Sequence, residues 1–130
     1  GRAATCFYNL YRHCLQSCIY EAGLALACGK KQIVPNTATG TVGGQFNFIT
    51  FGEDWAEHLF DYDRARSVPQ LTLYWQPGDW VKQMSEFGIV LAQIDLFGDS
   101  YEEIHAEAER LRRWLLKKPP QGRSGPRIQD

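Results

Sequence analysis

Apolar side chains recur at intervals of three and four residues near the start of the chain, and this spacing restricts what the segment can become. Residues spaced in this way share one face of an amphipathic helix, and the face needs a partner surface. We predict one helix from about Thr5 to Ala27, capped by Gly29 and bent or divided at Gly23. The residues of the stripe are Phe7, Leu10, Tyr11, Cys14, Leu15, Cys18 and Ile19.

The stripe starts within a few residues of Gly1, without a polar lead-in or a start methionine. A freely ending domain usually begins with a polar segment, so we expect a fragment of a larger protein. No signal peptide is recognised, and no uncharged apolar run approaches the ~18 residues that span a bilayer. We therefore expect a cytoplasmic protein without a membrane partner.

Composition and charge narrow the function classes. A chain of 130 residues that is 44% hydrophobic can form the core of one domain. Its net charge of -1 provides no basic field, so no nucleic-acid partner is expected. The cysteines lack the spacing of a zinc site, and we expect buried, reduced thiols rather than a disulfide framework. They are Cys6, Cys14, Cys18 and Cys28.

Three segments after the first helix have the patterns of strands. In residues 45–51, Phe46, Phe48 and Thr50 alternate with Asn47, Ile49 and Phe51, the pattern of a strand with two partly covered faces. Residues 71–75 are rich in strand formers and end at a Pro-Gly turn at 76–79, and residues 88–96 are predicted as a further strand. A short strand is predicted at 58–60 and a polar or helical turn at 61–66. Residues 35–44 have the composition of a loop.

A second helix is predicted to start at Ser100, because Ser100-x-x-Glu103 is a capping box. Its apolar stripe is Tyr101, Ile104, Ala108, Leu111 and Leu115. Residues 117–130 hold prolines and glycines with almost nothing apolar, and we expect a disordered tail or linker after a domain at 1–116. The predicted fold class is α+β, with an antiparallel sheet of about four strands flanked by an N-terminal and a C-terminal helix.

Several motifs permit a ligand site as well as a structural interpretation. Residues 40–44 are glycine-rich but lack the Gly-Lys-Ser ending of a phosphate loop, which favours a linker. The histidines have no metal-ligand spacing, so no metal site is predicted. The acidic residues at 53–54 and 61–63 are interpreted as solvated loop acids. Aromatic core packing is favoured over a stacking platform for Tyr74 and for Trp55, Trp75, Trp80 and Trp114.

The order of motifs in the second half resembles the C-terminal subdomain of ATP-grasp carboxylate–amine ligases, of the L-amino acid ligase and carnosine synthase-like group. The resemblance rests on a strand ending in Pro77-Gly78-Asp79, a strand Gly88-Ile89-Val90-Leu91-Ala92, and a helix opened by Gly98-Asp99-Ser100. It covers residues 45–116. It implies a fragment whose missing upstream ATP-grasp domain, in the same polypeptide, binds ATP and magnesium.

The resemblance also implies roles near Gly1. Members of the family share a Glu-x-Asn-x-Arg motif, in which the arginine contacts the transferring phosphate; Arg2 would be that catalytic residue. A small Gly-Gly segment usually follows, whereas this chain has Ala3-Ala4 and then Thr5 and Cys6, which would bind substrate. The implied reaction joins a small-molecule carboxylate and an amine through an acyl phosphate. The isolated chain would be inactive, and the alternative is a stand-alone α+β module that binds a protein or ligand without catalysis.

Overall fold

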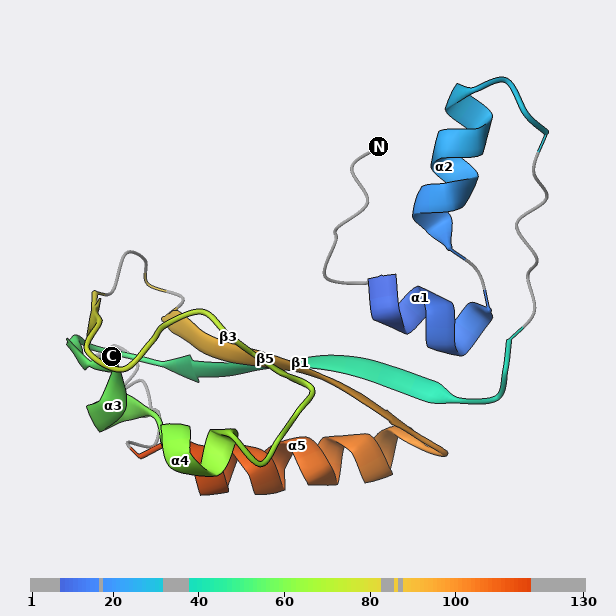
Figure 1. Cartoon of the computed structure of the whole chain (residues 1–130). Helices are drawn as coiled ribbons and strands as arrows, with labels where there is room; N and C mark the ends of the chain where they lie inside the picture. Colours follow the sequence, from blue (N-terminus) through green and yellow to red (C-terminus); the bar gives the residue numbers. More distant parts are fainter. Residues whose placement is uncertain (1–7, 17, 32–37, 83–85, 87, 118–130) are drawn as a thin grey trace, which may run out of the picture. The chain divides into compact units, whose positions relative to one another are not determined.

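The computed structural model describes residues 8–16, 18–31, 38–82, 86 and 88–117, and in these ranges the protein is α+β, as predicted. One sheet has three antiparallel strands in the order β1-β5-β3, and a second, two-stranded sheet pairs β2 with β4 (Figure 1). The strands are β1 (Val42–Thr50), β2 (Asp54–Trp55), β3 (Leu71–Leu73), β4 (Trp80–Val81) and β5 (Ile89–Gly98). The helices are α1 (Tyr8–Leu15), α2 (Ile19–Ala27), α3 (Ala56–Leu59), α4 (Tyr62–Ala65) and α5 (Tyr101–Leu115).

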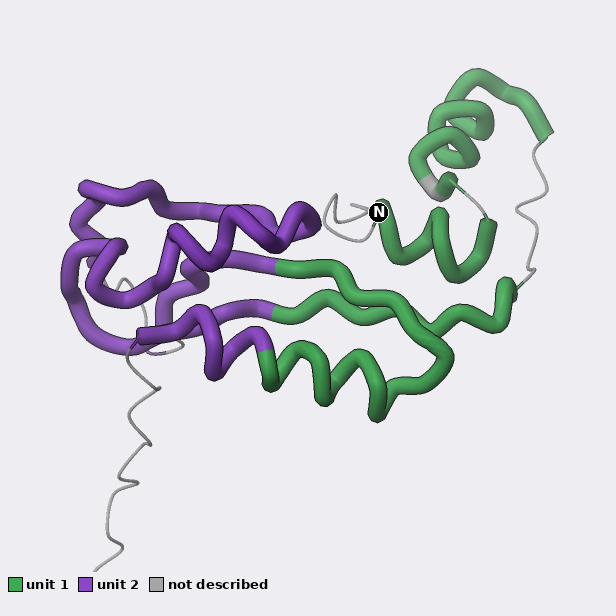
Figure 2. The backbone as a smooth tube through the Cα atoms, turned by 60° about the horizontal axis from the view of Figure 1, so that its bottom comes forward, with its two compact units in different colours: residues 1–46, 94–110 green, residues 47–93, 111–130 purple. Residues whose placement is uncertain are grey.

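The chain divides into two compact units (Figure 2). Unit 1 comprises residues 1–46 and 94–110, and unit 2 comprises residues 47–93 and 111–130. The strands β1 and β5 and the helix α5 each contribute residues to both units. The predicted single sheet of about four strands is wrong in detail, because β2 pairs with β4 in a separate ribbon.

The predicted helix from Thr5 to Ala27 is two helices. The break lies before Cys18, where Gln16 has a positive φ of 50°. Cys18 is the N-cap of α2, and its Sγ accepts a hydrogen bond from the backbone N–H of Glu21 at 3.5 Å. Gly23 lies inside α2 and does not divide it. The cap at Gly29 is confirmed: its φ is 73°, and the Lys30 N–H bonds to the carbonyl of Ala25 at 2.9 Å.

In unit 1, α1 packs on β1 at Gly43. A Cβ at this glycine would lie 2.7 Å from the Sγ of Cys14 and 3.0 Å from Leu10, so only glycine permits the approach. Residues 42–44, predicted as loop, belong to β1. No described residue of α1 is fully buried, and its apolar stripe is covered only in part.

Asp95 of β5 connects the elements of unit 1. Its carboxylate accepts hydrogen bonds from Asn9 of α1 at 3.2 Å and from Gln45 of β1 at 3.0 Å. At the end of α1, the Thr39 hydroxyl donates to the carbonyl of His13 at 3.0 Å. The bonds to Asp95 join α1 to the sheet. The Thr39 bond satisfies a carbonyl at the end of α1 that has no partner within the helix.

Unit 2 has the larger apolar core. The rings of Phe48 and Phe60 meet edge to face with centroids 5.9 Å apart. The predicted strand at 58–60 is wrong: Leu59 ends the short helix α3, and only Phe60 is extended, in an isolated bridge with Leu116. The helical turn predicted at 61–66 is confirmed as α4. Buried apolar residues of this unit include Phe48, Ala56, Leu59, Phe60, Ala65, Val81, Leu91 and Leu115.

The helix α5 starts where the capping box predicted. Ser100 Oγ accepts from the Glu103 N–H at 3.2 Å, and the Glu103 carboxylate accepts from the Asp99 N–H at 2.9 Å. Of the predicted stripe, Ile104, Ala108, Leu111 and Leu115 are buried. Tyr101 is 60% exposed, because side chains lean toward the N-terminus of a helix and this one extends beyond the covered face. Residues 118–130, predicted as a disordered tail, lie outside the described residues.

Candidate functional site

The residues predicted from the resemblance to act on phosphate and substrate are Arg2, Thr5 and Cys6, and all three lie outside the described residues. The cysteines that are described carry free thiols, but they are not buried as predicted. Cys14 and Cys18 are half-buried and Cys28 is exposed.

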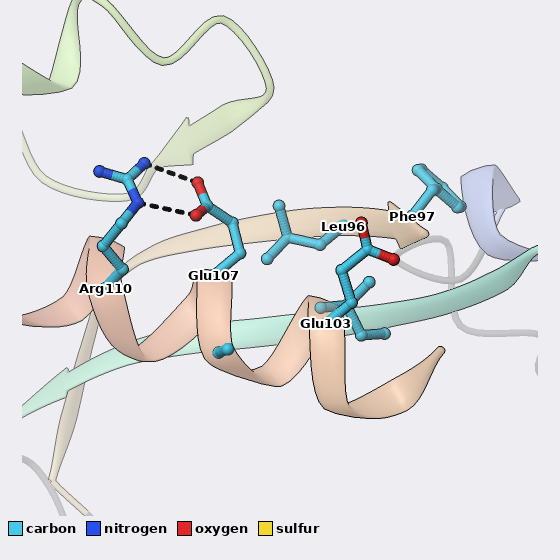
Figure 3. A pocket seen from close by; sticks show the side chains of 7 residues that line it. Leu96, Phe97, Glu103, Glu107 and Arg110 are labelled. Atoms are coloured by element: carbon cyan, nitrogen blue, oxygen red, sulfur yellow. Dashed lines mark hydrogen bonds and ion pairs between the residues drawn. The ribbon is translucent and has the colours of Figure 1, made fainter. Parts of the chain in front are cut away.

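The described residues form a cavity of about 430 Å³ in unit 1, beside the first half of α5 (Figure 3). Its size falls within the range of small-molecule sites. Leu96 and Phe97 line it from the end of β5 and Ile104 lines it from the buried face of α5. The other α5 residues of the lining, three of them charged, share a neighbouring face of the helix. The lining residues are Leu96, Phe97, Glu103, Ile104, Ala106, Glu107 and Arg110.

The charged groups of this cavity already have partners. Two hydrogen bonds, of 2.6 and 2.7 Å, join Arg110 to the carboxylate of Glu107, one turn earlier (Figure 3). The hydrogen bonds from Arg110 hold the pKa of Glu107 below its ordinary value. Glu103 is engaged in the cap of α5. Both carboxylates of the lining are thus held by contacts within α5 and its cap, while Leu96, Phe97 and Ile104 offer apolar surface to a ligand.

Phe97 limits the cavity on the side of α1. Its ring lies 4.6 Å, centroid to centroid, from the ring of His13, and 37% of its surface is exposed. Gly98 follows, and a Cβ there would lie 2.8 Å from the Glu103 carboxylate. A side chain at Gly98 would therefore displace the Glu103 carboxylate from its cap position, which the glycine leaves free.

The Pro-Gly-Asp motif forms a closed turn in unit 2. The Asp79 N–H bonds to the Gln76 carbonyl at 3.1 Å, and the Asp79 carboxylate accepts from the Gln76 N–H at 2.7 Å. Gly78 has a φ of 92°, which a type II turn requires at this position. Its N–H donates to the Glu57 carboxylate at 2.9 Å, and this bond lowers the pKa of Glu57. The motif thus has a structural role in this chain.

The tryptophans differ from the predicted core packing. Trp55 and Trp80 lie opposite each other on the β2–β4 ribbon, edge to face at 5.2 Å, and are 43% and 48% exposed. Trp75 is half-buried, and its indole N–H donates to the Val90 carbonyl at 3.1 Å. A two-residue ribbon leaves one of its faces in solvent, which sequence periodicity over so short a segment cannot reveal.

The histidines lie at the surface, as interpreted, but the acids were only partly placed correctly. Asp54 belongs to β2, Asp61 is the N-cap of α4 and Asp63 lies inside α4, so these three are not loop residues. His13, His58 and His105 are exposed, and His58 lies 2.9 Å from the Asp54 carboxylate. Asp61 caps α4 by accepting from the Arg64 N–H at 3.1 Å. Among the described residues, no group of His, Cys, Asp and Glu is arranged to hold a metal ion.

A second cavity, of about 310 Å³, is lined by residues of α1, of α2 and of the break between them. The prediction of one continuous helix missed it. The apolar stripe runs through the position of the break, so the sequence pattern does not reveal that Arg12 and Glu21 line one cavity. The lining residues are Tyr8, Arg12, Gln16, Cys18 and Glu21.

None of the helices in the described ranges has both the length and the apolar character that crossing a bilayer requires. In comparisons with known proteins, no family model, no curated protein and no solved structure matches this chain.

Proposed function

We propose that this chain is the C-terminal part of an ATP-grasp carboxylate–amine ligase, in which it supports an upstream ATP-binding domain of the same polypeptide. The observation that carries the proposal is the order of elements in the second half. A strand (β3) leads into the Pro77-Gly78-Asp79 turn, a long apolar strand (β5) follows, and Gly98-Asp99-Ser100 opens α5. This is the order that the resemblance requires.

In the proposed reaction, a carboxylate oxygen of one substrate attacks the γ-phosphorus of ATP and ADP leaves. The amine nitrogen of the second substrate then attacks the acyl carbon, inorganic phosphate leaves, and the amine loses a proton to solvent. Arg2 would neutralise charge on the transferring phosphate, because a guanidinium offers a fixed fork of donors to phosphate oxygens. Thr5 and Cys6 would contact substrate, and ATP and magnesium would be held upstream.

The test uses the longer polypeptide that this proposal requires. Its reading frame should carry Glu-x-Asn so that Gly1-Arg2 completes the motif. Arg2→Lys should leave folding intact and slow ATP-dependent phosphate release on the order of a hundredfold, since lysine keeps the charge but loses the bidentate fork. Arg113→Lys, an exposed position on α5, is the matched control. Equal turnover in the Arg2 variant would remove Arg2 from the site.

The alternative function is a binding module without catalysis. The exposed apolar side chains of α2 favour it: Leu24 is 67% exposed and Leu26 is 59% exposed. Large exposed apolar groups close together are typical of protein-contact surfaces. An upstream reading frame without Glu-x-Asn, or ADP release by the isolated 130-residue chain, would contradict the ligase proposal.

A further inference from the structure

The cavity at the break between α1 and α2 combines a cation and an anion on separate helices. Arg12 comes from the second half of α1, and Glu21 comes from the first turn of α2. Its volume of about 310 Å³ equals that of about ten water molecules in the liquid, which is enough for a small organic molecule. The remaining lining is a phenol, an amide and a thiol.

Neither charge is neutralised by the other. In the part of the chain that the structure describes, the ion pairs involve other residues, and Arg12 and Glu21 take part in none. The Nη1 of Arg12 donates to the Tyr8 hydroxyl at 3.0 Å, which restrains the guanidinium and leaves further donors for a ligand. An exposed charge without a partner is ordinary, but two opposite ones that line one cavity favour a ligand carrying both signs.

The residue that follows α1 has an unusual backbone conformation. Gln16 has a φ of 50°, in the left-handed region that a non-glycine residue rarely adopts. Such residues persist where the surrounding structure determines them, and they are concentrated at ligand-binding positions. Cys18 restrains the other side of the break, because its Sγ accepts the Glu21 N–H. This hydrogen bond fixes the first turn of α2, from which Glu21 lines the cavity.

We propose that this cavity binds the zwitterionic part of a free α-amino acid. The carboxylate of the ligand would pair with the Arg12 guanidinium, which binds carboxylates bidentately. The α-ammonium group would pair with the Glu21 carboxylate, and Gln16 would contact the ligand with its amide. The assignment of this ligand as an amino-acid substrate rests on the ligase function proposed above, whereas binding itself does not require it.

Cys18 provides a reporter inside the cavity, and Cys28 provides a matched control. Cys18 is the N-cap of α2 and Cys28 is its C-cap. Cys28 is exposed and does not line the cavity. The isolated chain is treated with iodoacetamide, and alkylation of each cysteine is followed by peptide mass spectrometry. L-alanine, L-glutamine and L-phenylalanine are added at millimolar concentration in separate samples.

At least one of these amino acids should slow the alkylation of Cys18 while leaving that of Cys28 unchanged. N-acetyl-L-alanine lacks the ammonium group and L-alaninamide lacks the carboxylate, so neither analogue should protect. Absence of protection by all three amino acids, or equal protection by the two analogues, would overturn the proposal. These outcomes need no variant and therefore do not depend on a mutant folding.

Variants then test the two charges. Arg12→Gln and Glu21→Gln should each weaken the protecting amino acid by about tenfold or more, because each loses a charge-assisted hydrogen bond. Arg113→Gln is the control, and circular dichroism reports whether α1 and α2 remain helical. An unchanged dissociation constant in a folded Arg12→Gln protein would also overturn the proposal.

Amino-acid binding at this cavity and ligase activity of the longer polypeptide can each be observed without the other. Protection of Cys18 without phosphate release from the longer polypeptide would leave an amino-acid binding site in a protein that is not a ligase. Phosphate release without protection of Cys18 would leave the ligase and place its amino-acid site elsewhere.

Discussion

Gly78 and Gly88 have the same backbone conformation in different surroundings. Their φ values are 92° and 84°, so alanine at either position is strained by roughly 1–2 kcal/mol. At Gly88 an added Cβ would also lie 2.7 Å from the Thr50 carbonyl oxygen, whereas at Gly78 it would meet nothing within 4 Å. Urea denaturation should therefore show a larger loss of unfolding free energy for Gly88→Ala, about 3 kcal/mol, than for Gly78→Ala. Equal losses would contradict the close approach of Gly88 to β1.

Tyr62 makes stability depend on pH in the alkaline range. Burial raises its pKa to about 12, with a further contribution from the charges of Asp79 and Glu57. Its hydroxyl donates to the Trp75 carbonyl at 3.0 Å. Because the folded pKa is above the unfolded one, near 10, the stabilisation is complete below the unfolded pKa and is lost as pH rises through the folded pKa.

Spectrophotometric titration at the tyrosinate band should accordingly show one late ionisation that Tyr62→Phe removes. The unfolding free energy of the wild type should fall between about pH 10 and 12, more steeply than that of Tyr62→Phe. Tyr74→Phe, at an exposed position in the same unit, is the control. Parallel pH profiles for the wild type and Tyr62→Phe would contradict the assignment.

At the scale of elements, the start of α5 depends on one hydroxyl. Ser100 Oγ accepts the Glu103 N–H, so Ser100→Ala should lower the unfolding free energy by about 1 kcal/mol. Ser100→Thr keeps an acceptor and should remain close to the wild type. Thermal or chemical denaturation decides it, and an unchanged midpoint for Ser100→Ala would refute the capping role.

At the scale of the whole molecule, stability depends on the core of unit 2. Phe60 is fully buried. The centroid of its ring lies 5.9 Å from that of Phe48 and 5.5 Å from that of Tyr62. Phe60→Ala should cost about 3–5 kcal/mol, which is a large part of the 5–15 kcal/mol typical of a domain. Leu24→Ala, at a side chain that is 67% exposed, should cost far less. Similar losses of unfolding free energy for the two variants would show that Leu24 of α2 is covered in solution.

Local patterns predicted the elements whose own sequence is sufficient to define them. The cap at Ser100, the stripe from Ile104 to Leu115, the Gly29 cap and the turn at 76–79 depend on contacts between residues a few positions apart. Such contacts leave a periodic or positional record in the sequence. The Glu107–Arg110 pair of the first cavity belongs to the same class, since its residues are one helical turn apart.

The sequence by itself therefore determined the α+β class, the three strands of the main sheet and the capped helix α5, because hydrophobic periodicity and turn chemistry are local. Tertiary structure decided the features that depend on distant partners. Phe60 is extended because Leu116 pairs with it, and residues 42–44 are a strand because β1 pairs with β5 in the main sheet. Trp55 and Trp80 are exposed because their strands pair outside the main sheet. Both cavities belong to this second group, since a cavity exists only where separate elements meet and fail to fill the space between them.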